Sequence, residues 1–260
     1  KRRVRRSGSP GVAWSKLLPD SRLRGSEPDR DYAFFCRVIK HIDLDILPVL
    51  GMPILQRGNM ALIRPFRALR PHREYVSRVA SVAYDVIEYE EALRIAERNA
   101  LTFLRVSRSE IDLPPDTDPY DIKVYEKASD NLASLREKEI LFQEDAPCFY
   151  VYRQAMGGHV QEGIVACVSI DEYLAGTIKK HELTRADKEA DRTRHFATVN
   201  AQTGPVFLAY RSSDIMNRLV DDVMQSAPEY DFETDDAIRH TVWVIRDPRG
   251  IDAVRHAFEQ

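Results

Sequence analysis

The segment CFYVYRQAMGGHVQEGIVACVSI, residues 148–170, contains two runs that are rich in β-branched and aromatic side chains. The runs cover residues 148–155 and 163–170, and the connection between them contains Gly157 and Gly158. Two such runs with a glycine-bearing connection predict a β-hairpin. The glycine pair is not typical of a phosphate-binding loop, because no Lys-Ser or Lys-Thr follows it. The sequence therefore predicts an antiparallel strand pair in the middle of the chain.

Helices and strands alternate after this hairpin. Thr184 can cap a helix that runs to about Asn200, and Asp187 stands at the capping-box position. Strands are predicted at residues 205–210 and 239–247. Pro248 opens a last helix, which runs to the final residue. A further helix lies between the two strands, with Ser213 as its cap and an apolar face made by Ile215, Leu219 and Val223.

The segment before the hairpin is also mixed. Extended or strand segments are predicted at residues 61–69 and 101–107, and residues 79–87 are expected to form a strand or a strand-to-loop passage. Residues 88–99 predict a helix with Ala92, Ile95 and Ala96 on one face. A Pro- and Asp-rich loop follows, and then a helix after Asp118 with Val124, Ala128, Leu132 and Leu135 at helical spacing. The expected fold class is α+β, with a mixed sheet and flanking helices.

Composition and charge restrict the function classes. Apolar residues make up 43% and charged residues 30% of the chain, which is ordinary for a soluble protein. No apolar run reaches the ~18 residues of a membrane span, and the basic start lacks the apolar core of a signal peptide. Cys148 and Cys167 lie in apolar runs and are expected to be buried free thiols. We therefore expect a cytoplasmic protein with no membrane partner.

Residues 1–59 differ from the rest of the chain. They hold 12 Lys and Arg against 6 Asp and Glu, whereas residues 60–260 hold 26 against 35. The acidic main body argues against a general nucleic-acid-binding surface. Met60 opens a segment that looks like a natural protein start. We expect residues 1–59 to be a disordered or artefactual basic extension, with an arm that binds RNA or an acidic partner as the alternative.

Residues 178–194 form a dense run of charged side chains between two apolar segments. His181 and Glu182 stand side by side just after the second hairpin strand. A carboxylate at a strand-to-helix junction can accept a proton from a substrate hydroxyl, and a histidine can bind phosphate or orient that carboxylate. The alternatives are a solvated Glu182 at a helix start and a structural His181.

Four cations continue this run, namely Arg185, Lys188, Arg192 and Arg194. Arginine suits phosphate, and the N-terminal end of a helix favours anions. Spacing places the first three on one helix face. Local ion pairs of Arg185 with Glu189 and of Lys188 with Asp191 explain the same residues, and they are the default interpretation for any one of them.

Polar side chains also follow two other apolar runs. The end of the run at residues 101–107 carries a polar cluster, made by Arg105, Ser107 and Arg108. This cluster is either a substrate-binding position or an ordinary polar loop. A second apolar run ends near Tyr84 and Asp85, which are candidates for lining the same pocket. The alternative for Tyr84 is a place in the hydrophobic core. No HExxH, paired CxxC, GxSxG or GxGxxG pattern occurs, and the sequence does not identify a metal site.

Six segments resemble, in order, the bacterial and archaeal family known as domain of unknown function 1015. They are PFRALRP, YDVI, NALTFLRVSRSEIDLP, YVYRQAMGG, IKKHELTRADKEADRTRH and TGPVFLAYR. The resemblance as a whole covers the chain from about residue 60 to residue 260. The family is normally proline-rich before Tyr84, but this chain reads SVAYD there. Family members usually continue into an Asp-Gly-His-His-Arg segment, so the chain resembles a copy with an incomplete C-terminus.

The resemblance implies a fold and two functions. Members of this family are similar to the ParB/sulfiredoxin superfamily, which includes nucleotide-dependent free serine kinases. It implies ParB/sulfiredoxin-like elements, a catalytic role for Glu182 with His181, and ATP or ADP with Mg as cofactors. The first hypothesis is phosphoryl transfer to a small hydroxyl metabolite such as free serine. The alternative is a nucleotide-binding regulatory module without turnover.

Overall fold

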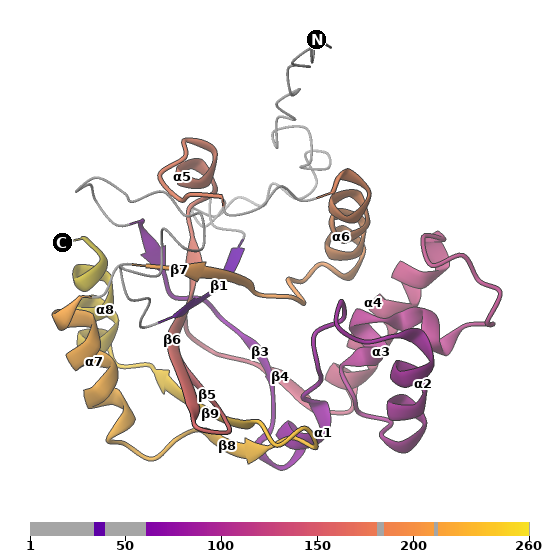
Figure 1. The fold of residues 1–260 in the computed structure, drawn as a ribbon, viewed down its shortest axis with the longest axis horizontal. Coiled ribbons are helices and arrows are strands. Elements are labelled where there is room, and N and C mark those ends of the chain that lie inside the picture. Colours follow the sequence, from indigo (N-terminus) through magenta and orange to yellow (C-terminus); the bar gives the residue numbers. More distant parts are fainter. Residues whose placement is uncertain (1–33, 40–60, 181–184, 211–212, 260) are drawn as a thin grey trace, which may run out of the picture.

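The computed structural model describes residues 61–180, 185–210 and 213–259, and the backbone of residues 34–39. A seven-stranded sheet with helices α7 (Asp214–Met224) and α8 (Pro248–Glu259) forms one part, which we call the sheet lobe. Helices α2 (Tyr89–Arg98), α3 (Leu104–Ser107), α4 (Ile122–Glu137) and α6 (Ala186–Val199) gather beside it as the helical lobe (Figure 1). The expected α+β class is confirmed.

The predicted hairpin is the centre of the sheet. Strand β5 (Phe149–Met156) pairs antiparallel with β6 (His159–Val168), and Met156 stands opposite His159. Gly157 adopts a φ of 57° in the two-residue turn, a conformation that glycine reaches without steric cost. The strands therefore extend into the connection that the sequence analysis placed at residues 156–162. Cys148 and Cys167 are both buried, as expected.

The other strands extend the sheet on both sides of the hairpin. The order is β7-β1-β6-β5-β9-β8, and β2 pairs with the end of β6. The β1–β7 pair is parallel and the others are antiparallel, so the sheet is mixed. The bounds are β1 (Phe34–Ile39), β2 (Ile63–Arg64), β7 (Val206–Ala209), β8 (Tyr230–Glu233) and β9 (Arg239–Ile245).

Strand β1 belongs to the stretch that the sequence analysis set apart as an extension. Its backbone pairs with β6 on one side and with β7 on the other. Residues 1–33 and 40–60 lie outside the described residues. The boundary at residue 59 and the artefactual origin of the extension therefore stay predictions.

Helices α7 and α8 cover one face of the sheet. The core joins Phe149, Val151 and Ile164 of the hairpin to Met216, Val220 and Val254 of the helices. Ser213 caps α7 as predicted, because its hydroxyl accepts a hydrogen bond from the Met216 amide. The predicted apolar face was partly wrong. Ile215 is exposed, while the stripe one residue further along, Met216 and Val220, is fully buried.

The helical lobe contains the main errors of the sequence analysis. Residues 104–107 form helix α3 instead of a strand. Leu104 and Val106 are both fully buried, and this alternation also fits a strand. Local backbone bonds decide in favour of the helix, with the Arg108 amide donating to the Leu104 carbonyl at 2.7 Å. Residues 79–87 do not form the strand that was one of the two predicted alternatives. Val79 ends the short helix α1 (Val76–Val79), and a loop follows.

Helices α2 and α4 confirm the predicted apolar periodicity. Ala92 and Ala96 are buried in α2. In α4 the buried residues include Val124, Ala128, Leu132 and Leu135, all four predicted positions. Helix α4 begins later than expected, because the Asp121 carboxylate accepts a hydrogen bond from the Lys123 amide and so caps the helix. Pro119 therefore precedes the helix.

A two-stranded ribbon connects the two lobes. Strand β3 (Leu69–Pro71) pairs antiparallel with β4 (Leu141–Gln143), and residues 72–140 of the helical lobe run between them. The ribbon is tied to the sheet lobe through Arg70, whose side chain is 9% exposed. Arg70 binds Glu144 at 2.6 Å and Glu229 at 3.0 Å, and it donates to the Tyr230 hydroxyl at 2.5 Å. We call this group the Arg70 cluster.

Candidate anion-binding site

Helix α6 carries three of the four predicted cations, Lys188, Arg192 and Arg194, and packs against α4 in the helical lobe. Its buried face is made by Asp191, His195 and Val199, which recur every four residues. Lys188 and Arg192 stand one turn apart on the same helix, with Lys188 exposed and Arg192 partly buried. Residues three or four apart on a helix are neighbours, so the two positive charges act on one surface.

Arg192 is the best-fixed cation of this surface. Its guanidinium lies 4.2 Å from the centre of the Tyr84 ring, which is within the range of a cation–π contact. The same guanidinium donates through Nε and Nη2 to the Asp191 carboxylate, at 3.0 and 2.8 Å. Asp191 also accepts a hydrogen bond from the buried Tyr125 hydroxyl at 2.9 Å. Burial, with this hydrogen bond as the second cause, raises the pKa of Tyr125 to about 12.

Tyr84 is half-buried where the loop after α1 approaches α6. Burial raises the pKa of its phenol, and the positive charge of Arg192 opposes that rise. The charges of Lys188, Asp85 and Asp191 also act on the phenol, so the Tyr84 loop and α6 share one electrostatic environment. Tyr84 is therefore part of this surface and is not a core residue alone.

Arg108 holds the Tyr84 loop in place. Its Nη1 donates to the Tyr84 carbonyl at 2.9 Å and to the Ile87 carbonyl at 2.5 Å, while its Nε binds Glu110 at 2.6 Å. The side chain is thus directed into the loop. It positions Tyr84 and does not extend toward a ligand.

A second tyrosine lies beside Lys188. The Lys188 ammonium is 6.0 Å from the centre of the Tyr120 ring, and Tyr120 is 42% exposed just before α4. The surface therefore combines two cations with two aromatic rings. We call Tyr84, Tyr120, Lys188 and Arg192 the α6 surface.

Two predicted residues have other roles in the described structure. Arg105 pairs with Asp112 and donates to the Ala96 carbonyl at 2.8 Å, so it joins α3 to η4 (Ser109–Asp112) and α2. The Ser107 hydroxyl donates to the Phe103 carbonyl one turn earlier, and Ser107 is buried. Both side chains support the packing of the helical lobe.

The remaining predicted cations are more exposed. Arg185 precedes α6 and pairs with Asp187 at 2.6 Å on the open surface. Arg194 is exposed, and its positive charge and a hydrogen bond from its side chain oppose the rise in the pKa of the Tyr125 phenol. The local ion pairs therefore involve Asp187 and Asp191 as partners of Arg185 and Arg192, where the sequence analysis had paired Arg185 with Glu189 and Lys188 with Asp191.

His181, Glu182 and the predicted cap Thr184 lie outside the described residues. Asp191 and Tyr125 were not among the predicted site residues, although they fix Arg192. The sequence contains a partial signal for Asp191. It lies four residues before His195 and eight before Val199, a spacing that places the three on one helix face, and this is the buried face of α6.

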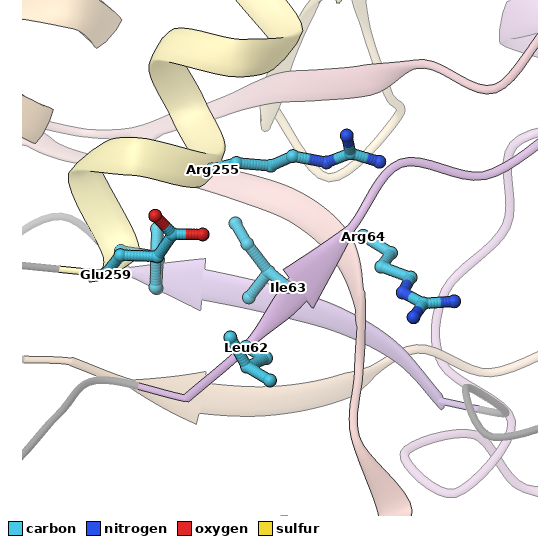
Figure 2. A pocket seen from close by; sticks show the side chains of 6 residues that line it. Leu62, Ile63, Arg64, Arg255 and Glu259 are labelled. Carbon is cyan, nitrogen blue, oxygen red and sulfur yellow. The ribbon is translucent and has the colours of Figure 1, made fainter.

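Two hollows open on the sheet lobe. One has a volume of about 330 Å³ between β2 and the end of α8, with Arg64, Arg255 and Glu259 at its rim (Figure 2). The other, of about 370 Å³, lies beside β8 and β9 and is lined by Asp231, Arg239 and Trp243 among others. None of the predicted site residues lines either hollow.

Among the described residues, no group of three or more His, Cys, Asp and Glu is placed to hold a metal ion. The same part of the chain contains no helix that is long and apolar enough to span a membrane.

Fold and surface together define an α+β protein in which Lys188 and Arg192 of helix α6 lie beside two tyrosines from neighbouring loops of the helical lobe. Residues 63–260 match the family model described as "Protein of unknown function (DUF1015)". The chain belongs to this family, and the resemblance seen in the sequence is confirmed. Searches of curated proteins and of solved structures found no match.

Proposed function

We propose that this protein binds ATP or ADP at the α6 surface and transfers a phosphoryl group to a small hydroxyl metabolite such as free serine. The observation that supports the proposal is the pair of Arg192, fixed over Tyr84 at 4.2 Å, and Lys188 one turn before it. Lys188 lies in the first turn of α6, where the helix dipole adds to the attraction of an anion.

The chemistry of the surface favours phosphate. Arginine offers a planar fork of donors that matches phosphate oxygens, and lysine adds a compact point charge. Phosphoryl transfer depends mainly on such positioning and charge stabilisation. The exposed ring of Tyr120 beside Lys188 offers a flat apolar face to a base.

The catalytic base of this proposal is Glu182, which the family resemblance suggests. In the sequence it precedes α6 by four residues, and a carboxylate there would take the proton of the acceptor hydroxyl. The described residues provide no carboxylate cluster for Mg²⁺. We therefore assign no protein ligands to a metal and derive no step through it.

The test is to incubate the full chain with ATP or ADP, Mg²⁺ and serine, and to measure phosphoserine by mass spectrometry. We expect product from the unchanged chain, with Arg192→Ala and Glu182→Gln both strongly impaired. Arg239→Ala is the control, because Arg239 is an exposed cation of the sheet lobe that pairs with Asp231. Full activity of Glu182→Gln would reject the assigned base.

A regulatory module that binds nucleotide without turnover is the second candidate. Its supporting observation is that Lys188 and Arg192 lie beside Tyr120 and Tyr84, which are groups suited to nucleotide binding, and this function needs no catalytic base. Calorimetry with ATP, ADP and CTP separates the two functions. Tight binding that depends on Arg192, without phosphoserine, would support the regulatory module.

A further inference from the structure

The strongest unassigned feature is the buried pair of Tyr125 and Asp191 behind Arg192. Asp191 is 7% exposed and Tyr125 is 1% exposed. Burial of a carboxylate is costly unless it is paired and hydrogen-bonded. Here both conditions are met, since one oxygen accepts the Tyr125 hydroxyl and the other accepts two Arg192 donors.

We infer that Tyr125 and Asp191 are positioning residues, which hold the Arg192 guanidinium in the orientation needed to grip a phosphate. This inference rests on the proposed binding of a phosphorylated ligand at the α6 surface. Tyr125 comes from α4 and Asp191 from α6, so their hydrogen bond also fixes the two helices against each other.

The geometry explains how positioning works. Asp191 occupies the Nε side of the guanidinium, and the Tyr84 ring covers one face. Within the described structure no acceptor binds Nη1, so its donors can bind a ligand together with the ammonium of Lys188. An arginine fixed in this way loses little side-chain entropy when a ligand arrives, which is the advantage of preorganisation.

The substitution Asp191→Asn separates positioning from simple electrostatics, because the two explanations predict opposite changes in anion affinity. Asp191→Asn removes a negative charge beside the site, so a purely electrostatic view predicts tighter binding of an anion. Positioning predicts weaker binding, because the amide is a poorer acceptor for two guanidinium donors. The sign of the change therefore separates the two views.

Tyr125→Phe is the most conservative test, since it removes one hydroxyl and no charge. Its matched control is Tyr210→Phe, because the Tyr210 hydroxyl is buried without a hydrogen-bond partner in the described structure. Binding of ADP and of inorganic phosphate to the full chain is measured by calorimetry at low salt. We expect Tyr125→Phe to weaken binding about tenfold, near the lower limit for one lost hydrogen bond to a charged group, and Tyr210→Phe to leave it unchanged.

A second readout does not depend on ligand affinity. The Nε–H resonance of Arg192, assigned by its loss in Arg192→Lys, reports the orientation of the guanidinium in the free protein. It should shift or broaden in Tyr125→Phe and Asp191→Asn, but not in Tyr210→Phe. If either variant fails to fold, the other supplies both measurements.

The outcomes are distinct. Weaker ADP binding by both variants, with the altered resonance, supports the inference. Unchanged binding in Tyr125→Phe, tighter binding in Asp191→Asn, or an unchanged Arg192 resonance overturns it. If the unchanged chain binds neither ADP nor phosphate, the proposed function fails and the positioning role falls with it. A shifted resonance would then establish only that Tyr125 orders Arg192.

Discussion

Replacing Arg70 by Met tests whether charge pairing fixes the β3–β4 ribbon to the sheet lobe. Methionine keeps an unbranched apolar stem and removes the guanidinium. The side chains of Arg70 and Glu144 are each 9% exposed, so the substitution leaves a buried carboxylate with fewer partners. Arg246, which is 49% exposed, still lies 3.2 Å from Glu144 and compensates in part.

The size of the effect follows from this geometry. Removing one partner of a buried ion pair costs about 3–5 kcal/mol, and the remaining Arg246 contact places the expected loss near the lower end of that range. Urea unfolding followed by circular dichroism gives the free energy of unfolding. Arg239→Met is the control. Arg239 is 61% exposed in its pair with Asp231, and exposed pairs contribute only about 0–1 kcal/mol.

A loss in Arg70→Met no larger than that in the control would refute the reasoning. A double variant adds a check on the mechanism. Adding Glu144→Gln to Arg70→Met should recover part of the stability, because it removes the uncompensated negative charge.

Three further outcomes are expected. Asp121→Ala removes the cap of α4 and should lower the free energy of unfolding by about 1 kcal/mol in urea. Phe149→Ala should cost about 3–5 kcal/mol because Phe149 is fully buried, whereas Phe207→Ala, at a residue 53% exposed, should change little in the same assay. Burial lowers the pKa of His195 below its usual 6.5, so the unfolded chain takes up this proton first as the pH falls. The free energy of unfolding should therefore decline below about pH 6.5, by at most about 1.4 kcal/mol per pH unit. The decline should be smaller in His195→Gln, which lacks this titrating group.

Local sequence signals predicted much of the fold. The hairpin was recognisable because Gly157 stands between two β-rich runs, and α4 because Val124, Ala128, Leu132 and Leu135 recur at helical spacing. Residues 104–107 were misassigned because a short buried helix and a strand can bury the same alternating residues. The difference lies in local backbone hydrogen bonds, such as the one from the Arg108 amide to the Leu104 carbonyl, which the side-chain pattern does not encode.

The site was predictable only in part. Arg192 and Tyr84 were singled out separately, yet nothing in the sequence indicates that they touch across 108 residues. The role of Arg108 was also hidden, because its donors bind backbone carbonyls of the Tyr84 loop. Such contacts depend on tertiary packing and not on residue type. Asp191 looked like an ordinary surface charge until its burial was known.

The antiparallel pairing of β3 with β4 has a consequence for how this family can vary. Pro71 faces Leu141 across the ribbon, so the segment between them leaves and returns at neighbouring points. Paired residues in such a ladder have Cα atoms only about 5 Å apart. A shorter or longer insert can therefore be accommodated there without moving the strands of the sheet. A grafted reporter domain should therefore be tolerated in an exposed loop of this segment, such as residues 114–116, and not in α4, where Tyr125 and Ala128 are buried.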